Sequence, residues 1–89
     1  MLADKIAITN QLGLHARASA KLTQVAGKYK SEIWLSRDEK RVNAKSIMGV
    51  MMLAAGKGTI LDIEVNGIDE QEAMAEIKEL VQNKFGEDQ

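Results

Sequence analysis

The chain has no cysteine, no proline and only one histidine. Without cysteine it can form neither a disulfide framework nor a thiolate metal site. A single histidine, with no cluster of carboxylates beside it, cannot hold a first-row metal, so we expect no metal and no cofactor. A small domain without such cross-links depends on an efficient hydrophobic core, which is typical of an intracellular protein.

The chain also lacks an excess of charge of either sign, and aromatic side chains are few. The chain carries 12 basic and 13 acidic residues, for a net charge of −1, and its aromatic fraction is 3%. No block of Lys or Arg stands out, and no aromatic ladder is present on which bases could stack. The composition therefore argues against a nucleic-acid partner.

Long hydrophobic runs are absent as well. No apolar run approaches the roughly 20 residues of a membrane span, and residues 1–10 lack the pattern of a signal peptide. We expect no membrane insertion and a cytoplasmic location. The length of 89 residues leaves no room for a second core, so residues 1–89 are expected to form a single domain.

The apolar residues that are present follow two periods along the chain. Alternation of apolar and polar side chains predicts strands at residues 5–9, 31–37, 41–44 and 59–66. Apolar residues at helical spacing predict helices at 16–28, 46–54 and 69–85. Because apolar and polar side chains alternate along the strands, we expect one face of the sheet to be exposed to solvent. The predicted fold is α+β: an open-faced β-sandwich of order β-α-β-β-α-β-α, with four antiparallel strands and three helices on one face.

Two helix starts carry recognisable capping residues. Ser46 is a good N-cap for the short helix, and Asp69 and Glu72 have the spacing of a capping box for the last helix.

The only histidine, His15, stands at the predicted start of the first helix. The backbone N–H groups of Ala16, Arg17 and Ala18 then lie in the first turn and lack intrahelical acceptors. Together with the positive end of the helix dipole they make an anion site, to which Arg17 adds a permanently charged fork. Small neighbouring residues are expected to leave the imidazole uncovered.

An exposed imidazole beside an anion site can act as a nucleophile toward phosphorus. The helix start and Arg17 would partly offset the charge of the phosphoryl group. These residues therefore suit a histidine phosphoryl carrier. The alternative is that His15 merely caps the helix and that Arg17 is solvated.

The segment 46–54 is apolar on nearly every side, so part of it must remain exposed. We expect Val50 and Leu53 in the core and Met48 and Met51 in an adaptable docking patch. Ser46 caps the helix, and a phosphate on it would be tolerated by the dipole while placing charge beside the patch.

Two segments resemble the signature segments of the HPr family, the histidine-containing phosphocarriers of the bacterial sugar phosphotransferase system. They are LGLHARASAK at residues 12–21 and VNAKSIMGVMMLAAGKGT at 42–59. The resemblance implies that enzyme I, phosphorylated by phosphoenolpyruvate, transfers its phosphoryl group to His15, at Nδ1, and that an enzyme IIA domain receives it. It implies that Arg17 stabilises the phosphate and that Ser46 is the target of an HPr serine kinase/phosphatase in many bacteria.

The resemblance also implies a docking surface and a monomeric carrier that is not an enzyme. The surface comprises Ala20, Ile47, Met48 and Met51. Lys21, Lys28 and Lys45 either ring this surface and steer an acidic partner or are simply solvated.

One residue departs from the family pattern. Most relatives read H-x-R-P, whereas this chain has Ala18. Loss of the proline costs about 0.5–1 kcal/mol through the entropy of the unfolded chain. We expect phosphoryl transfer to survive with a slightly looser loop.

Two alternatives to the sugar pathway stay open. One is a carrier in a nitrogen-related or regulatory phosphotransfer chain. The other is a docking module without chemistry at His15.

Overall fold

A computed structural model describes residues 1–87. The elements follow the predicted order, and they are β1 (Leu2–Ala7), α1 (Ala16–Gly27), β2 (Glu32–Arg37), β3 (Lys40–Asn43), α2 (Ile47–Met52), β4 (Ile60–Asn66), α3 (Glu70–Gln82) and a 3₁₀ turn, η1 (Lys84–Gly86). None of the helices in this range is long and apolar enough to cross a membrane.

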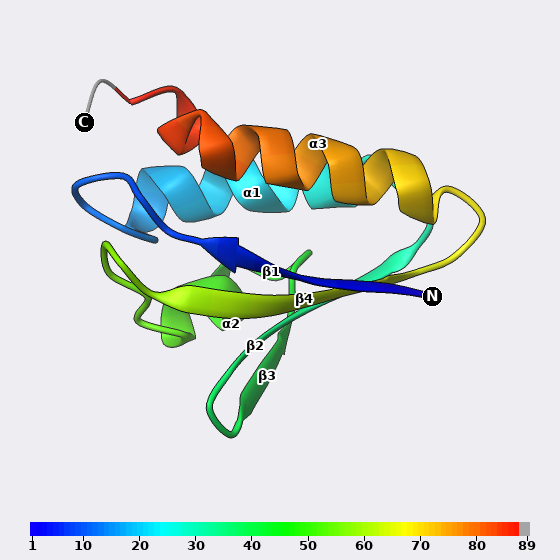
Figure 1. The fold of residues 1–89 in the computed structure, drawn as a ribbon, viewed down its shortest axis with the longest axis horizontal. Helices are drawn as coiled ribbons and strands as arrows, with labels where there is room; N and C mark the ends of the chain where they lie inside the picture. Colours follow the sequence, from blue (N-terminus) through cyan, green and yellow to red (C-terminus); the bar gives the residue numbers. More distant parts are fainter. Residues whose placement is uncertain (88–89) are drawn as a thin grey trace.

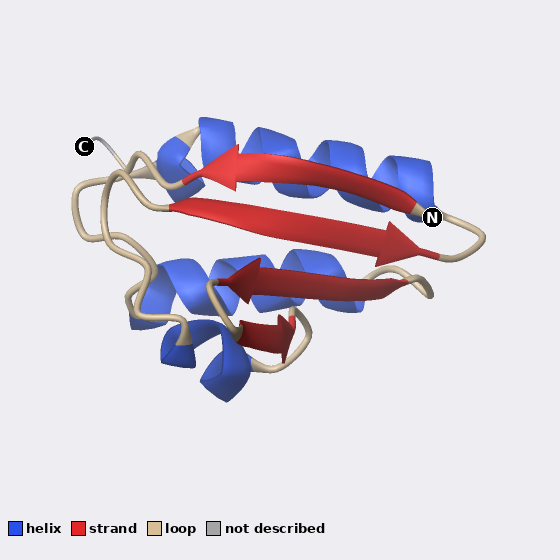
Figure 2. Ribbon diagram, turned by 60° about the horizontal axis from the view of Figure 1, so that its bottom comes forward, coloured by secondary structure: helices blue, strands red, loops and turns tan. Residues whose placement is uncertain are grey.

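The four strands form one sheet in the order β1-β4-β2-β3, and every neighbouring pair is antiparallel. The ribbon shows α1 and α3 lying side by side along the sheet, and the turned view places both behind it (Figures 1 and 2). Helix α2 contacts α1 and β3. The open-faced α+β fold is confirmed.

The core lies between the sheet and the helices. The alternating residues of β4, namely Leu61, Ile63 and Val65, are fully buried, and their polar neighbours face away. From the helices come the apolar stripes of α1 (Ala18, Leu22, Ala26) and α3 (Ala73, Met74, Ile77, Val81). The two predicted periods therefore identify the residues that fill the core.

The first strand is displaced from its predicted range of 5–9. It runs from Leu2, which pairs with Val65, to Ala7, which pairs with Ile60. Backbone pairing with β4 extends the strand through residues whose side chains do not alternate, and periodicity cannot reveal such pairing. Ile8 follows the strand but is still buried, and its N–H donates to Thr59 O at 2.9 Å.

The predicted capping box of the last helix is wrong. Asp69 precedes α3, but its carboxylate accepts the N–H groups of Lys30 and Ser31 at 2.8 and 2.9 Å instead of capping the helix. Glu70 accepts the N–H of Gly67 at 3.2 Å. The turn after α1 therefore competes successfully for the carboxylate that local spacing assigned to α3.

The last helix is also shorter than the predicted range of 69–85. It ends at Gln82, and η1 follows it. Lys84 and Phe85 have positive φ values of 56° and 57°, which lie outside the right-handed helical region.

Candidate functional site

The loop before α1 is held against the loop between α2 and β4. Leu14 donates its N–H to Ala55 O at 2.8 Å, and its side chain is buried. Gly13 has a φ of +63°, and a Cβ there would lie 2.4 Å from Ala55 O. Only glycine allows the two backbones to approach so closely, and this contact fixes where the next residue, His15, enters the helix.

His15 is the N-cap of α1, as the sequence predicts. Its backbone is extended (φ −74°, ψ 179°), and its Nδ1 accepts the N–H of Arg17 at 3.3 Å. The first bond of the helix runs from Ser19 N–H to His15 O at 2.9 Å. The N–H groups of Ala16 and Ala18 lie ahead of that bond and lack intrahelical acceptors. Nδ1 therefore faces the donors of the helix start.

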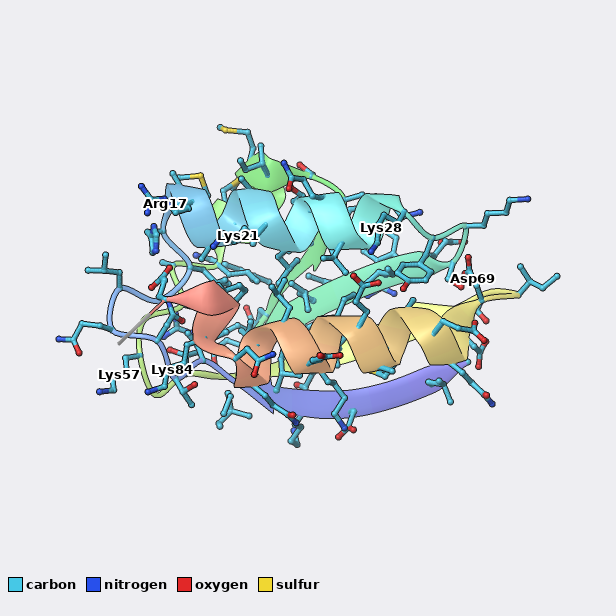
Figure 3. The ribbon with its side chains drawn as sticks, turned by 90° about the horizontal axis from the view of Figure 1, so that it is seen from above. Arg17, Lys21, Lys28, Lys57, Asp69 and Lys84 are labelled. Carbon is cyan, nitrogen blue, oxygen red and sulfur yellow. The ribbon has the colours of Figure 1, made fainter. Side chains whose placement is uncertain are left out.

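Arg17 is exposed, and its guanidinium makes no hydrogen bond or ion pair within residues 1–87. Figure 3 places Arg17 at the His15 end of α1, far from Lys28 at the other end. A guanidinium without an anion at the positive end of a helix can bind two oxygens of a phosphoryl group. The structure thus brings His15, Ala16, Arg17 and Ala18 together as expected.

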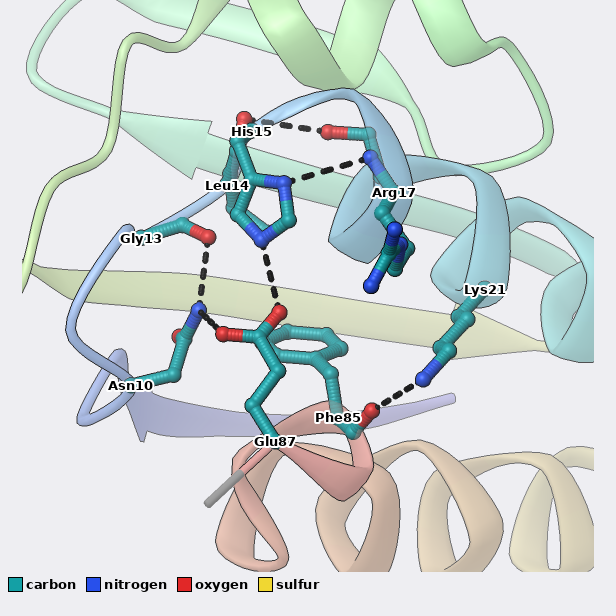
Figure 4. Close-up of polar contacts among 9 residues, drawn as sticks. Asn10, Gly13, Leu14, His15, Arg17, Lys21, Phe85 and Glu87 are labelled. Carbon is teal, nitrogen blue, oxygen red and sulfur yellow. Dashed lines mark hydrogen bonds and ion pairs between the residues drawn. The ribbon is translucent and has the colours of Figure 1, made fainter. Parts of the chain in front are cut away.

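The imidazole is less open than the small neighbouring residues led us to expect. Its Nε2 lies 2.6 Å from Oε2 of Glu87, and the two side chains are 27% and 17% exposed. Figure 4 shows the carboxylate between His15 and Asn10, whose Nδ2 donates to Glu87 Oε1 at 3.1 Å. The hydrogen bond with His15, helped by that from Asn10, lowers the pKa of Glu87, whereas burial opposes this shift.

Sequence reasoning missed both Glu87 and Asn10. Glu87 contacts His15 across 72 positions of the chain, so no local pattern connects them. Asn10 is fully buried and donates to Gly13 O at 2.8 Å. Asparagine and glycine close together are typical of a tight turn, and this local pattern is the one feature of the sequence that could have drawn attention to Asn10.

An exposed apolar patch lies on α2, beside the His15 end of α1. Met48 and Met51 are 68% and 41% exposed and Ile47 is 40% exposed, whereas Val50 and Leu53 are buried. In Figure 3 the methionine sulfurs of this region lie on the same side of the molecule as Arg17. Ala20 is half-buried on α1.

Two further exposed apolar side chains were not singled out from the sequence, one on α2 and one in the loop before α1. Met52 is 63% exposed and Leu12 is 68% exposed.

Ser46 is the N-cap of α2, and its Oγ accepts the N–H of Gly49 at 3.1 Å. The predicted structural role of Ser46 is confirmed.

The lysines that were considered for steering make contacts inside the molecule. Lys21 Nζ donates to Phe85 O at 2.6 Å, and Lys45 Nζ donates to Tyr29 O at 2.7 Å. Lys28 pairs with Glu76 at 2.5 Å. Each ammonium therefore has a structural partner.

Among residues 1–87, no group of three or more His, Cys, Asp or Glu side chains could hold a metal ion. The polar groups that the described structure brings together at this site are the imidazole, the guanidinium, the helix start and the carboxylate of Glu87.

Residues 2–83 match the family described as the PTS HPr component phosphorylation site. The phosphocarrier protein HPr of Cupriavidus necator is 58% identical over 87 residues, which is 98% of each chain. HPr of Neisseria meningitidis serogroup A is 55% identical, also over 87 residues and 98% of each chain. A crystal structure of HPr from Thermoanaerobacter tengcongensis superimposes with a TM-score of 0.96 at 44% identity and covers 100% of both chains.

The match extends over nearly the whole chain in sequence and over all of it in fold. The chain therefore belongs to the HPr family, the phosphocarrier proteins of the phosphotransferase system.

Proposed function

We propose that His15 is the phosphoryl acceptor of this carrier, that the group attaches at Nδ1, and that Arg17 stabilises it. The observation that carries the proposal is the position of His15 as N-cap, with Nδ1 facing the first-turn N–H of Arg17. A nucleophilic nitrogen and an anion site then share one place.

The transfer step uses groups that the unphosphorylated site already holds. The Nδ1 lone pair attacks phosphorus, the bond between phosphorus and its donor atom on enzyme I breaks, and the electron pair of that bond stays with the donor. When Nδ1 bonds to phosphorus it no longer accepts the Arg17 N–H, so this donor becomes available to a phosphoryl oxygen. Ala16 and Ala18 supply further N–H groups, and the Arg17 guanidinium offsets the charge.

The onward acceptor is an enzyme IIA domain, and we propose that Ala20, Ile47, Met48 and Met51 form the surface to which enzyme I and the IIA domain dock. The exposure of the methionines on α2 supports this, since flexible thioether side chains adapt to more than one partner. We further propose a monomer acting in the cytoplasm in sugar uptake, with Ser46 as a site of regulatory phosphorylation. A phosphate on Ser46 would lie at the start of α2, directly beside the patch.

The test is phosphorylation by phosphoenolpyruvate and a catalytic amount of bacterial enzyme I. We expect one acid-labile phosphoryl group in the intact mass of the wild-type chain and none in His15→Ala. Arg17→Lys keeps the charge but loses the planar fork, so we expect slower transfer with the same final mass. An unchanged phosphoryl group in His15→Ala would refute His15 as the acceptor.

A further inference from the structure

We propose that Glu87 is a positioning residue: it holds the proton of the His15 imidazole on Nε2 and thereby leaves the lone pair on Nδ1 to accept the phosphoryl group. The inference rests on the proposed function of His15, because it assigns the ring nitrogen that reacts.

Two contacts on opposite sides of the ring specify the same tautomer. Glu87 Oε2 lies 2.6 Å from Nε2, and an ionised carboxylate only accepts, so Nε2 must carry a proton. The N–H of Arg17 points at Nδ1 from 3.3 Å and only donates, so Nδ1 must be the unprotonated nitrogen. A neutral ring with its proton on Nδ1 would set that proton against the Arg17 N–H and would leave two acceptors, Nε2 and the carboxylate, facing each other.

The carboxylate is itself held by the loop that carries His15. Asn10 Nδ2 donates both to Glu87 Oε1 at 3.1 Å and to Gly13 O at 2.8 Å. This orientation leaves Asn10 Oδ1 buried without a partner within residues 1–87. Flipping the amide would place Oδ1 against two acceptors, so Asn10 is committed to donating to the carboxylate.

The backbone on the other side of Glu87 is anchored as well. Phe85 is fully buried, and Lys21 Nζ donates to its carbonyl oxygen at 2.6 Å. Figure 4 shows how the chain turns after Phe85 and brings Glu87 beneath the imidazole. The contact with His15 is therefore fixed from two elements, the loop before α1 and the turn after α3.

The same contact serves both halves of the transfer. When Nδ1 attacks phosphorus, the ring acquires positive charge while its proton stays on Nε2, and the Glu87 carboxylate offsets that charge. In the return step a ring that keeps its Nε2 proton is the better leaving group, because it departs as neutral imidazole. Within residues 1–87 Lys21 is the other charged group that acts on this carboxylate, and its ammonium donates to Phe85 O rather than to the ring.

The experiment compares wild-type protein with Glu87→Ala and Glu87→Gln. Glu79→Ala is the matched control, because Glu79 is an exposed carboxylate on α3 whose side chain makes no hydrogen bond or ion pair in the described residues. The imidazole ¹⁵N shifts report which nitrogen is protonated, and a single histidine makes them unambiguous. The initial rate of phosphorylation by enzyme I is measured on the same samples, and amide spectra confirm the fold.

We expect the wild type and Glu79→Ala to show the Nε2–H tautomer alone. Glu87→Ala should show a mixture with Nδ1–H and transfer about tenfold more slowly, at the lower end of the roughly 10–100-fold loss that follows removal of the hydrogen-bonding partner of a metal-bound histidine. Glu87→Gln keeps an acceptor oxygen without the charge, so it should retain the tautomer better than Glu87→Ala while still transferring more slowly than the wild type.

An unchanged tautomer in Glu87→Ala overturns the inference, even if the rate falls, because the loss would then reflect docking. A shifted tautomer with a wild-type rate overturns it too. The ¹⁵N measurement needs no enzyme I, so it tests Glu87 separately. A wild-type chain that gains no phosphoryl group refutes the proposed function instead.

Discussion

Among single residues, Ala18 is the one that departs from the HPr pattern within the site itself. It is the third residue of α1, its side chain is fully buried, and its N–H lies ahead of the first bond of the helix. A proline at this position would lose no intrahelical hydrogen bond, because there is none to lose. Alanine here therefore gives the anion site one more N–H donor, and it leaves the unfolded chain with more conformational entropy.

We expect Ala18→Pro to raise the free energy of unfolding by about 0.5–1 kcal/mol, through reduced entropy of the unfolded chain. Urea unfolding measures this change. Ala20→Pro is the control: it lies further inside α1, and the loss of a helical hydrogen bond there should cost about 3 kcal/mol or more. Phosphoryl transfer should occur in the wild type as well as in Ala18→Pro. If only the proline variant accepted phosphate, the expectation that alanine suffices would be wrong.

At the scale of an element, the turn after α3 completes the site by placing Glu87 beside His15. Lys84 and Phe85 both have positive φ, a conformation that costs L residues about 1–2 kcal/mol each. The turn persists because Phe85 fills the core and Lys21 holds its carbonyl oxygen. Local strain is thus retained at the point where the chain carries Glu87 back to His15.

We expect Lys84→Gly to raise the free energy of unfolding by about 0.5–1 kcal/mol, since the relief of strain exceeds the extra entropy of glycine in the unfolded chain. Gln82→Gly, two residues earlier at the end of α3, should lower it by about 0.5–1 kcal/mol because the backbone there is helical. Urea unfolding of the two variants measures both signs. A loss of stability in Lys84→Gly would show that the turn is not strained at this residue.

For the whole molecule, ionised carboxylates tie elements together. A hydrogen bond from the Ser31 hydroxyl, with help from the N–H of Lys30, lowers the pKa of Asp69. Other carboxyl groups whose pKa is lowered by a hydrogen-bonding partner in another part of the fold are Asp4, Glu76 and Glu87. These groups join the segments at the two ends of α1 to α3 and the turn after it, and they join β1 to α3.

A carboxyl group whose pKa is lowered on folding stabilises the native state above its unfolded pKa, and this stabilisation is lost as the pH falls through its folded value. We therefore expect the free energy of unfolding to be level from pH 7 to about 5 and to fall progressively below about pH 4. Urea unfolding at each pH measures it. Asp69→Asn should be less stable at pH 7, and its free energy of unfolding should fall less steeply than that of the wild type as the pH is lowered below about 4. A fall as steep as that of the wild type would show that Asp69 does not contribute to this pH dependence.

The sequence by itself determined the features that arise from short-range pattern. The period of two in residues 60–66 and the period of 3.6 in α1 identified the core faces, because burial of one face needs no partner in particular. His15 and Ser46 were identified as N-caps because capping depends on the residues that follow within one turn. The anion site at His15 and the exposed methionines of α2 are local in the same sense.

Only the tertiary structure decided where side chains meet across the chain. The pairing of Leu2 with Val65 lengthened β1, and Ser31 took the carboxylate that the spacing around Asp69 assigned to a helix cap. The contact of Glu87 with His15 joins the two ends of the sequence, and it depends on a turn with positive φ and on a buried phenylalanine. Such contacts result from the competition of distant groups for the same partner, which no local period encodes.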